Sequence, residues 1–174
     1  MSDDWRMLTL IGKDGPGIVA GVTSALAGSG VSLGETSMLR LGGNFTIMMM
    51  ISGEADDESL RAMLEPVVAT YGMRLHIDHI DARLHEHLVP NVQVTVSGAD
   101  RVGIVAQVTN ALAEGGFNIL DLDSDVAGSS DDPVYILLIT GIANETVEQV
   151  EQRLEPLRQS GVSVNVSAIE TYIG

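Results

Sequence analysis

The chain has 174 residues, no cysteine, and 24 acidic against nine basic residues, which gives a formal net charge of −15. The lack of cysteine excludes disulfides, thiolate catalysis and cysteine-ligated zinc. The acidic balance, without a cluster of Lys and Arg, argues against direct binding to nucleic acid or to an anionic membrane surface. Any control of transcription would therefore require a protein partner.

The chain carries no targeting signal that we recognise. Residues 1–5 lack the basic start and apolar stretch of a secretion signal. No apolar run approaches the roughly 20 residues that span a bilayer. We therefore expect a cytoplasmic protein.

The sequence repeats itself at an offset of 86 residues. Residues 14–30 read DGPGIVAGVTSALAGSG and residues 100–116 read DRVGIVAQVTNALAEGG, with eleven of the seventeen positions identical. The similarity continues to the LEP triplets at 64–66 and 154–156. This repeat predicts two domains over residues 5–84 and 91–174, joined by a linker over 85–90.

Each repeat predicts the element order β-α-β-β-α-β. The first repeat begins with a strand over 7–11 and a helix that has Asp14 as N-cap and a buried stripe of Val19, Val22 and Leu26. Two strands over 31–41 and 45–51 follow, joined by a Gly42-Gly43 turn. A second helix, with an apolar stripe over 60–71, and a last strand over 73–77 complete the repeat. The second repeat follows the same order, with Asp100 as the corresponding cap. This order is typical of the ferredoxin-like split βαβ in the α+β class.

The third strand of each repeat is apolar on both faces. Residues 47–51 read IMMMI and residues 135–139 read YILLI. A half-solvated antiparallel strand alternates between apolar and polar residues. We therefore expect the open sheet faces to be buried by the sister domain or by a second chain.

The turn before the first helix of each repeat is a candidate ligand site. It reads Asp14-Gly15-Pro16-Gly17-Ile18 in the first repeat and Asp100-Arg101-Val102-Gly103-Ile104 in the second. A helix N-terminus has unpaired N–H groups and a partial positive charge, so it suits a carboxylate. An ammonium group would need an acceptor, such as a carbonyl or the amide of Asn118. Alternatively, the glycines allow close packing and the aspartates are ordinary caps; on the residues alone, both interpretations stay open.

The run D-x-x-G-I-V-A-x-V-T-x-A-L-A, a helix-ending Gly and a following hydrophobic strand resemble the ACT domain, twice over nearly the whole chain. A chain that consists of two such domains without a catalytic domain is most similar to the glycine cleavage system transcriptional repressor group. The resemblance implies amino-acid binding at interfaces between ACT modules through the two glycine-bearing turns, with glycine or serine as first guesses. The resemblance also implies that Asn118, and Ser32 in the first repeat, are polar strand positions with which one ACT module contacts the ligand at the turn of a neighbouring module.

The two turns depart from the family pattern in different ways. The usual Pro is Pro16 in the first repeat but Val102 in the second, and the usual Arg is Gly15 in the first but Arg101 in the second. Each repeat keeps half of the pattern, which puts the equivalence of the two sites in doubt.

Signatures of metal sites and enzymes are missing from the sequence. All four histidines lie within residues 76–87 among acidic residues, but their spacing matches no known metal site. No nucleophile elbow, P-loop or dinucleotide fingerprint occurs. We expect a non-catalytic regulator without metal or cofactor that forms a homo-oligomer, senses an amino acid and acts through a protein partner such as a transcription factor. The alternative is a ligand-free structural or interaction module.

Overall fold

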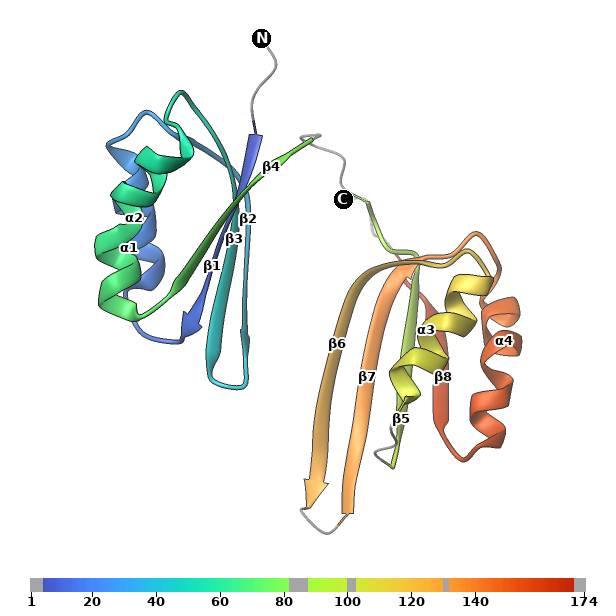
Figure 1. The fold of residues 1–174 in the computed structure, drawn as a ribbon. Helices are drawn as coiled ribbons and strands as arrows, with labels where there is room; N and C mark the ends of the chain where they lie inside the picture. Colours follow the sequence, from blue (N-terminus) through green and yellow to red (C-terminus); the bar gives the residue numbers. More distant parts are fainter. Residues whose placement is uncertain (1–4, 82–87, 100–102, 130–131, 171–174) are drawn as a thin grey trace. The chain divides into compact units, whose positions relative to one another are not determined.

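The computed structural model describes residues 5–81, 88–99, 103–129 and 132–170. The chain divides into two compact units, Met1–Glu86 and His87–Gly174 (Figure 1). The predicted linker over 85–90 lies partly outside the described residues.

The first unit contains β1 (Trp5–Lys13), α1 (Ile18–Ala27), β2 (Ser32–Leu41), β3 (Asn44–Ser52), α2 (Asp57–Tyr71) and β4 (Arg74–Ile80). The second unit contains β5 (Val92–Ala99), α3 (Ile104–Glu114), β6 (Asn118–Ser129), β7 (Asp132–Ile142), α4 (Val147–Gln159) and β8 (Ser163–Ala168). The predicted βαββαβ order is thus confirmed in both units.

Each unit is a four-stranded antiparallel sheet with two helices on one face. The strand orders are β2-β3-β1-β4 and β6-β7-β5-β8. Figure 1 shows α1 and α2 side by side on one face of the first sheet. These arrangements confirm the predicted ferredoxin-like α+β fold.

The cores between helices and sheet are largely aliphatic. In each unit, alternate residues of the two central strands point to the helices, and the helices contribute residues one turn apart. Fully buried members of the first core include Leu8, Leu10, Val22, Leu26, Ile47, Leu60 and Leu64; those of the second include Val94, Val96, Val108, Leu112, Leu137, Ile139 and Leu154.

One detail of the predicted core is wrong. Ile18, Val22 and Leu26 are the buried stripe of α1, whereas Val19 is exposed. Residues four apart on a helix share a face, and Val19 lies about 100° around the helix from Ile18. Val19 is consequently available at the surface beside the start of α1.

The β2–β3 hairpin turns through Gly42 and Gly43 as predicted. Both glycines have positive φ, 56° and 77°, which a type I′ turn requires. The turn fixes the register of the hairpin, so that Arg40 pairs with Phe45 and Met38 with Ile47. Because Phe45 and Ile47 belong to the core, Arg40 and Met38 lie on the helix-bearing side of the sheet.

Strand β2 is an edge strand that the helices leave uncovered. All its residues except Gly34 are exposed, including the large apolar Leu33, Leu39 and Leu41. On the open sheet face, Met48 is 42% exposed, whereas Met50 is buried beside Gly34 and Trp5. Cover for the open face by another surface therefore stays a prediction.

Candidate functional site

Helix α1 begins without a side-chain cap. Its N-cap is Gly17, in a left-handed conformation with φ 90°, and no side chain accepts a hydrogen bond from the first turn. The first intrahelical bond runs from the Gly21 N–H to the Gly17 carbonyl at 2.8 Å. The preceding N–H groups, of Ile18, Val19 and Ala20, therefore have no acceptor within the helix.

The prediction that Asp14 caps α1 is wrong. The chain needs three more residues to enter the helix, and the left-handed Gly17 takes the cap position. The carboxylate of Asp14 instead lies 2.6 Å from the guanidinium of Arg40. The backbone N–H of Asp14 donates to the carbonyl of Gly43 at 3.2 Å, which ties the turn to the β2–β3 hairpin.

Tyr71, at the end of α2, contacts the turn that precedes α1. Its hydroxyl donates to the carbonyl of Pro16 at 3.2 Å. A Cβ built on Gly17 would lie 2.7 Å from the Tyr71 hydroxyl oxygen. The turn thus requires glycine at position 17 for two reasons, its left-handed backbone and the close approach of Tyr71.

An open cleft of about 600 Å³ lies between this turn and the uncovered part of β2. The turn and the first residues of α1 form one side, and side chains from β2 and β3 form the other. Its lining consists of Asp14, Gly15, Pro16, Gly17, Ile18, Val19, Ala20, Met38, Arg40 and Phe45. All five predicted site residues of the first turn lie in this lining.

The chemistry of the cleft comes mainly from backbone and from one ion pair. The side chain of Ile18 is buried in the core, so this residue offers its backbone N–H. Arg40 is the one basic residue among the residues that line the cleft, and its side chain is 68% exposed, against 24% for Asp14. The cleft therefore combines helix N–H donors, a cation and an anion within one small region.

Ser32 does not reach this cleft within its own unit. It stands at the start of β2, paired with Ser52, while Arg40 lies near the other end. Eight residues of extended strand correspond to about 26 Å. Ser32 is exposed and does not line the cleft of its own unit.

The second unit repeats the backbone geometry at its helix start. Gly103 is the N-cap of α3 with φ 89° and no side-chain cap, and the Gln107 N–H donates to its carbonyl at 3.0 Å. Ile104 is buried like Ile18. Asp100, Arg101 and Val102 lie outside the described residues. Asp100, the predicted cap of this helix, is thus not described, and the N-cap of α3 in the structure is Gly103.

The second unit differs on the strand side. Gly98 pairs with Tyr135 and Tyr135 with Val126, where the first unit has Gly12, Phe45 and Arg40 in the same register. An exposed valine thus replaces the arginine of the first cleft. Asn118 stands exposed at the start of β6, paired with Ile142, in the place of Ser32.

Comparison with known proteins identifies the repeated unit. The ACT domain family matches residues 7–78 and again residues 91–167. The chain belongs to the ACT domain family. The UPF0237 protein YjhC of Lactococcus lactis is 34% identical over 74 residues, which are 42% of this chain and 85% of that protein. This relative therefore corresponds in length to one ACT domain.

Two solved structures share the tandem arrangement of the ACT chain. An unknown protein from Galdieria sulphuraria has a TM-score of 0.76 at 21% identity, over 97% of this chain and all of its own. A proposed glycine cleavage system transcriptional repressor has a TM-score of 0.70 at 18% identity, over 98% of this chain and 100% of that protein. At these identities the likeness shows the fold. Membership of the ACT family supports a ligand-sensing, regulatory and non-catalytic role.

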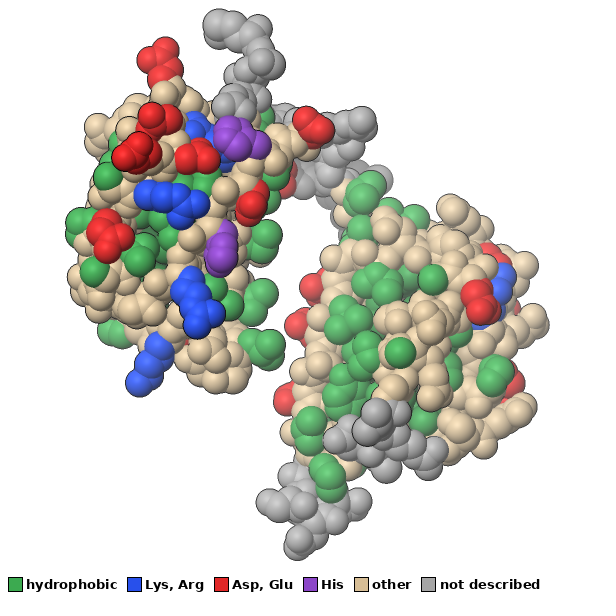
Figure 2. All heavy atoms as spheres, in the orientation of Figure 1, with side chains coloured by type: hydrophobic (Ala, Val, Ile, Leu, Met, Phe, Trp, Pro, Cys, Tyr) green, Lys and Arg blue, Asp and Glu red, His purple; other side chains and the backbone are tan. Residues whose placement is uncertain are grey.

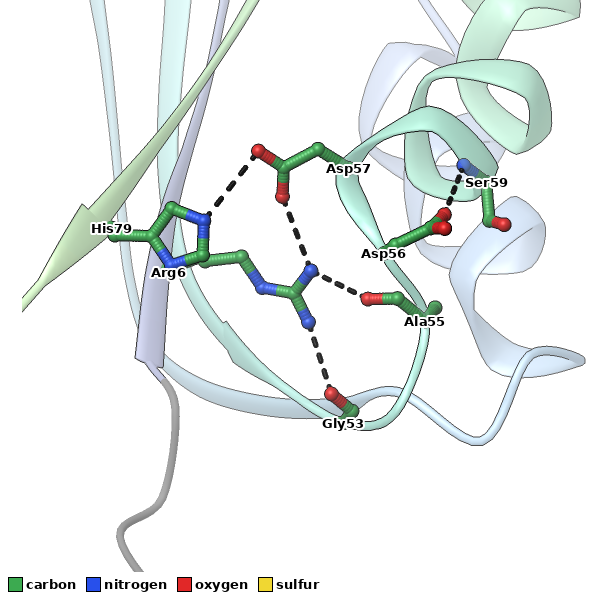
Figure 3. A network of polar contacts seen from close by, with 7 residues as sticks. All are labelled: Arg6, Gly53, Ala55, Asp56, Asp57, Ser59 and His79. Atoms are coloured by element: carbon green, nitrogen blue, oxygen red, sulfur yellow. Dashed lines mark hydrogen bonds and ion pairs between the residues drawn. The ribbon is translucent and has the colours of Figure 1, made fainter.

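A buried arginine organises the opposite end of the first ACT domain, and no sequence pattern predicted it. Arg6 on β1 is 2% exposed, and its guanidinium donates to the carbonyls of Ala55 and Gly53 and to the carboxylate of Asp57 (Figure 3). The Asp57 carboxylate also lies 3.6 Å from His79. These contacts fix the loop that leads from β3 into α2.

Asp56 is the N-cap of α2. Its carboxylate accepts from the Ser59 N–H at 2.8 Å, and hydrogen bonds from the side chain and then the backbone of Ser59 lower the pKa of Asp56. Asp56 and Asp57 therefore both have structural roles, the first as the helix cap and the second as a partner of Arg6. Since the Arg6 network lies at the end of β1 remote from Asp14, it is separate from the cleft.

The described residues contain no cluster of three His, Asp or Glu side chains that could hold a metal ion. Within the same residues, no helix has the length and apolar character needed to cross a membrane. Of the four histidines, His76 and His79 are described, and His85 and His87 lie outside the described residues.

Proposed function

We propose that this tandem ACT protein is a cytoplasmic, non-catalytic regulator that senses an amino acid at interfaces between ACT modules and acts on transcription or metabolism through a protein partner. Glycine and serine are the first ligands to test. The observation that carries the proposal is the cleft of the first domain, where uncapped helix N–H groups, a cation and an anion face one open volume.

The groups in the cleft match those of a free amino acid. The N–H groups of Ile18, Val19 and Ala20 point along the helix axis toward its N-terminus, where the helix dipole favours negative charge. A ligand carboxylate placed there would accept these donors. Its ammonium group would find an acceptor in the turn, and the absence of a side chain at Gly17 lets a small molecule approach the backbone.

The size of the cleft favours a site that a second module completes. The volume of 600 Å³ lies within the range of about 300–1,000 Å³ that is usual for small-molecule pockets. Glycine and serine are among the smallest such ligands and would leave most of this volume empty. The cleft is open along β2, an edge strand with apolar side chains and unpaired backbone groups. A module from another copy that packs along β2 would bury both the strand and the ligand, and could supply Ser32 or Asn118.

The charge of the protein constrains its partner. A net charge of −15 repels nucleic acid phosphates, so regulation of transcription would pass through a transcription factor and not through DNA. Figure 2 shows acidic side chains along the side of the second domain where Figure 1 places β6. Asp121, Asp123 and Asp125 are exposed on this strand and would suit a basic partner surface.

Calorimetry of the full-length chain against the twenty amino acids tests the proposal. We expect heat of binding with at least one, and its loss in Val19→Phe, which places a larger side chain in the lining of the cleft at the start of α1. Ser24→Phe introduces the same side chain on α1 at an exposed position that does not line the cleft, and this variant should bind normally. Absence of binding for all twenty would contradict the sensor and favour a ligand-free interaction module.

A further inference from the structure

The Asp14–Arg40 ion pair joins the two sides of the cleft. Asp14 belongs to the turn before α1, and Arg40 to the edge strand β2. Their charged atoms are 2.6 Å apart, and no other described residue forms an ion pair with Arg40. Because the guanidinium is mostly exposed, the pair adds little to stability and can open at small cost.

We infer that this pair is a charge-exchange gate that selects zwitterionic α-amino acids. The inference rests on the proposed function and assigns the specificity of the same cleft. On entry, the ligand ammonium would replace Arg40 as the partner of Asp14. The ligand carboxylate would accept from Arg40 and from the helix N–H groups in place of Asp14. No covalent bond changes, and both protein charges keep an opposite charge nearby.

The selectivity follows from counting charges. An amine without a carboxylate could satisfy Asp14 but would leave the Arg40 guanidinium and the helix N–H groups without an anion. A carboxylic acid without an amine could satisfy Arg40 but would leave the Asp14 carboxylate beside a second anion. Only a ligand that carries an ammonium and a carboxylate group close together, as on one α-carbon, replaces both members of the original pair, since polar groups that lose a partner weaken binding.

The gate is specific to the first domain. In the second domain, the strand position of Arg40 is occupied by Val126, whose side chain carries no charge. The same exchange of partners between turn and strand cannot take place there. The two ACT domains would therefore respond differently to the same amino acid, in agreement with the unequal turn sequences of the two repeats.

Titration calorimetry of the full-length chain at low ionic strength tests the gate with two sets of probes. The first set is glycine, methylamine and acetate, and the second is serine, ethanolamine and 3-hydroxypropanoate. We expect the wild type to prefer each amino acid over both of its single-charge analogues by at least about tenfold. In Arg40→Met, affinity for the amino acid should fall by about ten- to a hundredfold, as expected when a charged hydrogen-bond partner is lost.

The two gate variants should change specificity in opposite directions, which a structural role would not explain. Arg40→Met should lose the preference over the amine, and Asp14→Asn the preference over the carboxylic acid. Arg40→Lys should restore part of the affinity because it restores the charge. Arg61→Met removes an exposed arginine of α2 that does not line the cleft and should change nothing.

Each outcome decides the matter. If the wild type binds glycine or serine and both gate variants bind with unchanged affinity and selectivity, the gate is overturned while the sensor proposal stands. If the wild type binds neither amino acid, the gate and these ligand choices fail together. Because Arg40 is exposed, its variants should keep the far-UV circular dichroism of the wild type, so a loss of binding cannot be attributed to unfolding.

Discussion

The two helix-capping glycines provide a matched pair of perturbations. Gly17 and Gly103 have nearly identical backbones, with φ of 90° and 89°. Replacing either with alanine forces a side chain into the left-handed region, at about 1–2 kcal/mol. The backbone contribution should therefore be the same in the two ACT domains.

The surroundings of the two glycines differ. An alanine Cβ at position 17 would lie 2.7 Å from the Tyr71 hydroxyl oxygen, whereas at position 103 the nearest atom, on Gln107, is 3.9 Å away. Displacing Tyr71 would break its bond to Pro16, worth about 0.5–1.5 kcal/mol, and strain its rotamer by about as much. Gly17→Ala should therefore destabilise its domain by roughly 1–3 kcal/mol more than Gly103→Ala destabilises the other.

Urea unfolding of the full-length chain, followed by amide NMR signals of each domain, measures both free energies of unfolding. Tyr71→Phe removes both the clashing hydroxyl and its hydrogen bond to Pro16, so Gly17→Ala made in the Tyr71→Phe background should cost only the backbone penalty relative to Tyr71→Phe alone. Equal destabilisation of the two domains, or no relief from Tyr71→Phe, would refute this account of the turn.

Three further predictions concern stability. Arg6→Met should cost the first domain about 2–3 kcal/mol, because Asp57 and the carbonyls of the β3–α2 loop lose their donors, and hydrogen exchange should show the second domain unchanged. Asn91→Ala should cost the second domain about 1–3 kcal/mol in urea unfolding, since it removes the bonds of 2.9 and 2.8 Å that join Asn91 to Ala143. The hydrogen bond from Arg153 lowers the pKa of Glu145, so this pair stabilises the second domain above the ordinary carboxyl pKa, and the contribution is lost as pH falls through the lowered value. Glu145→Gln should therefore flatten the decline of stability in acid titration below about pH 4.5; an unchanged slope would contradict the assignment.

The fold could be predicted from the sequence because its patterns are short-range and occur twice, once in each repeat. The repeated run at 14–30 and 100–116 specified two copies of one unit, and short apolar runs, alternating or apolar on both faces, placed the strands. The Gly42-Gly43 pair specified the hairpin turn because only glycine adopts positive φ freely at both positions.

The start of α1 could not be placed from local preference. Asp14 is a favoured cap residue, but its partner is Arg40 on a different strand, and the cap is a glycine without a side-chain acceptor. A stripe beginning at Ile18 fits the spacing of Val22 and Leu26 as well as one beginning at Val19, so periodicity alone did not decide between them.

Two features of the site depend on long-range geometry. Arg40 reaches the cleft because the hairpin register places it opposite the buried Phe45. Counting back from the glycine turn would have found this position, because a tight turn fixes the register. The contact of Tyr71 with Pro16 spans 55 residues and has no local signature. The turn motif identified one side of the cleft, and the tertiary structure was needed for the other.

Amide NMR of the full-length chain during titration with glycine and with serine tests the central claim most directly. The account predicts saturable shifts concentrated at residues that line the cleft of the first domain, among them Gly15, Gly17, Ile18, Val19, Ala20, Met38 and Arg40. Shifts confined to β4 or α4, or a spectrum unchanged by both amino acids, would contradict it.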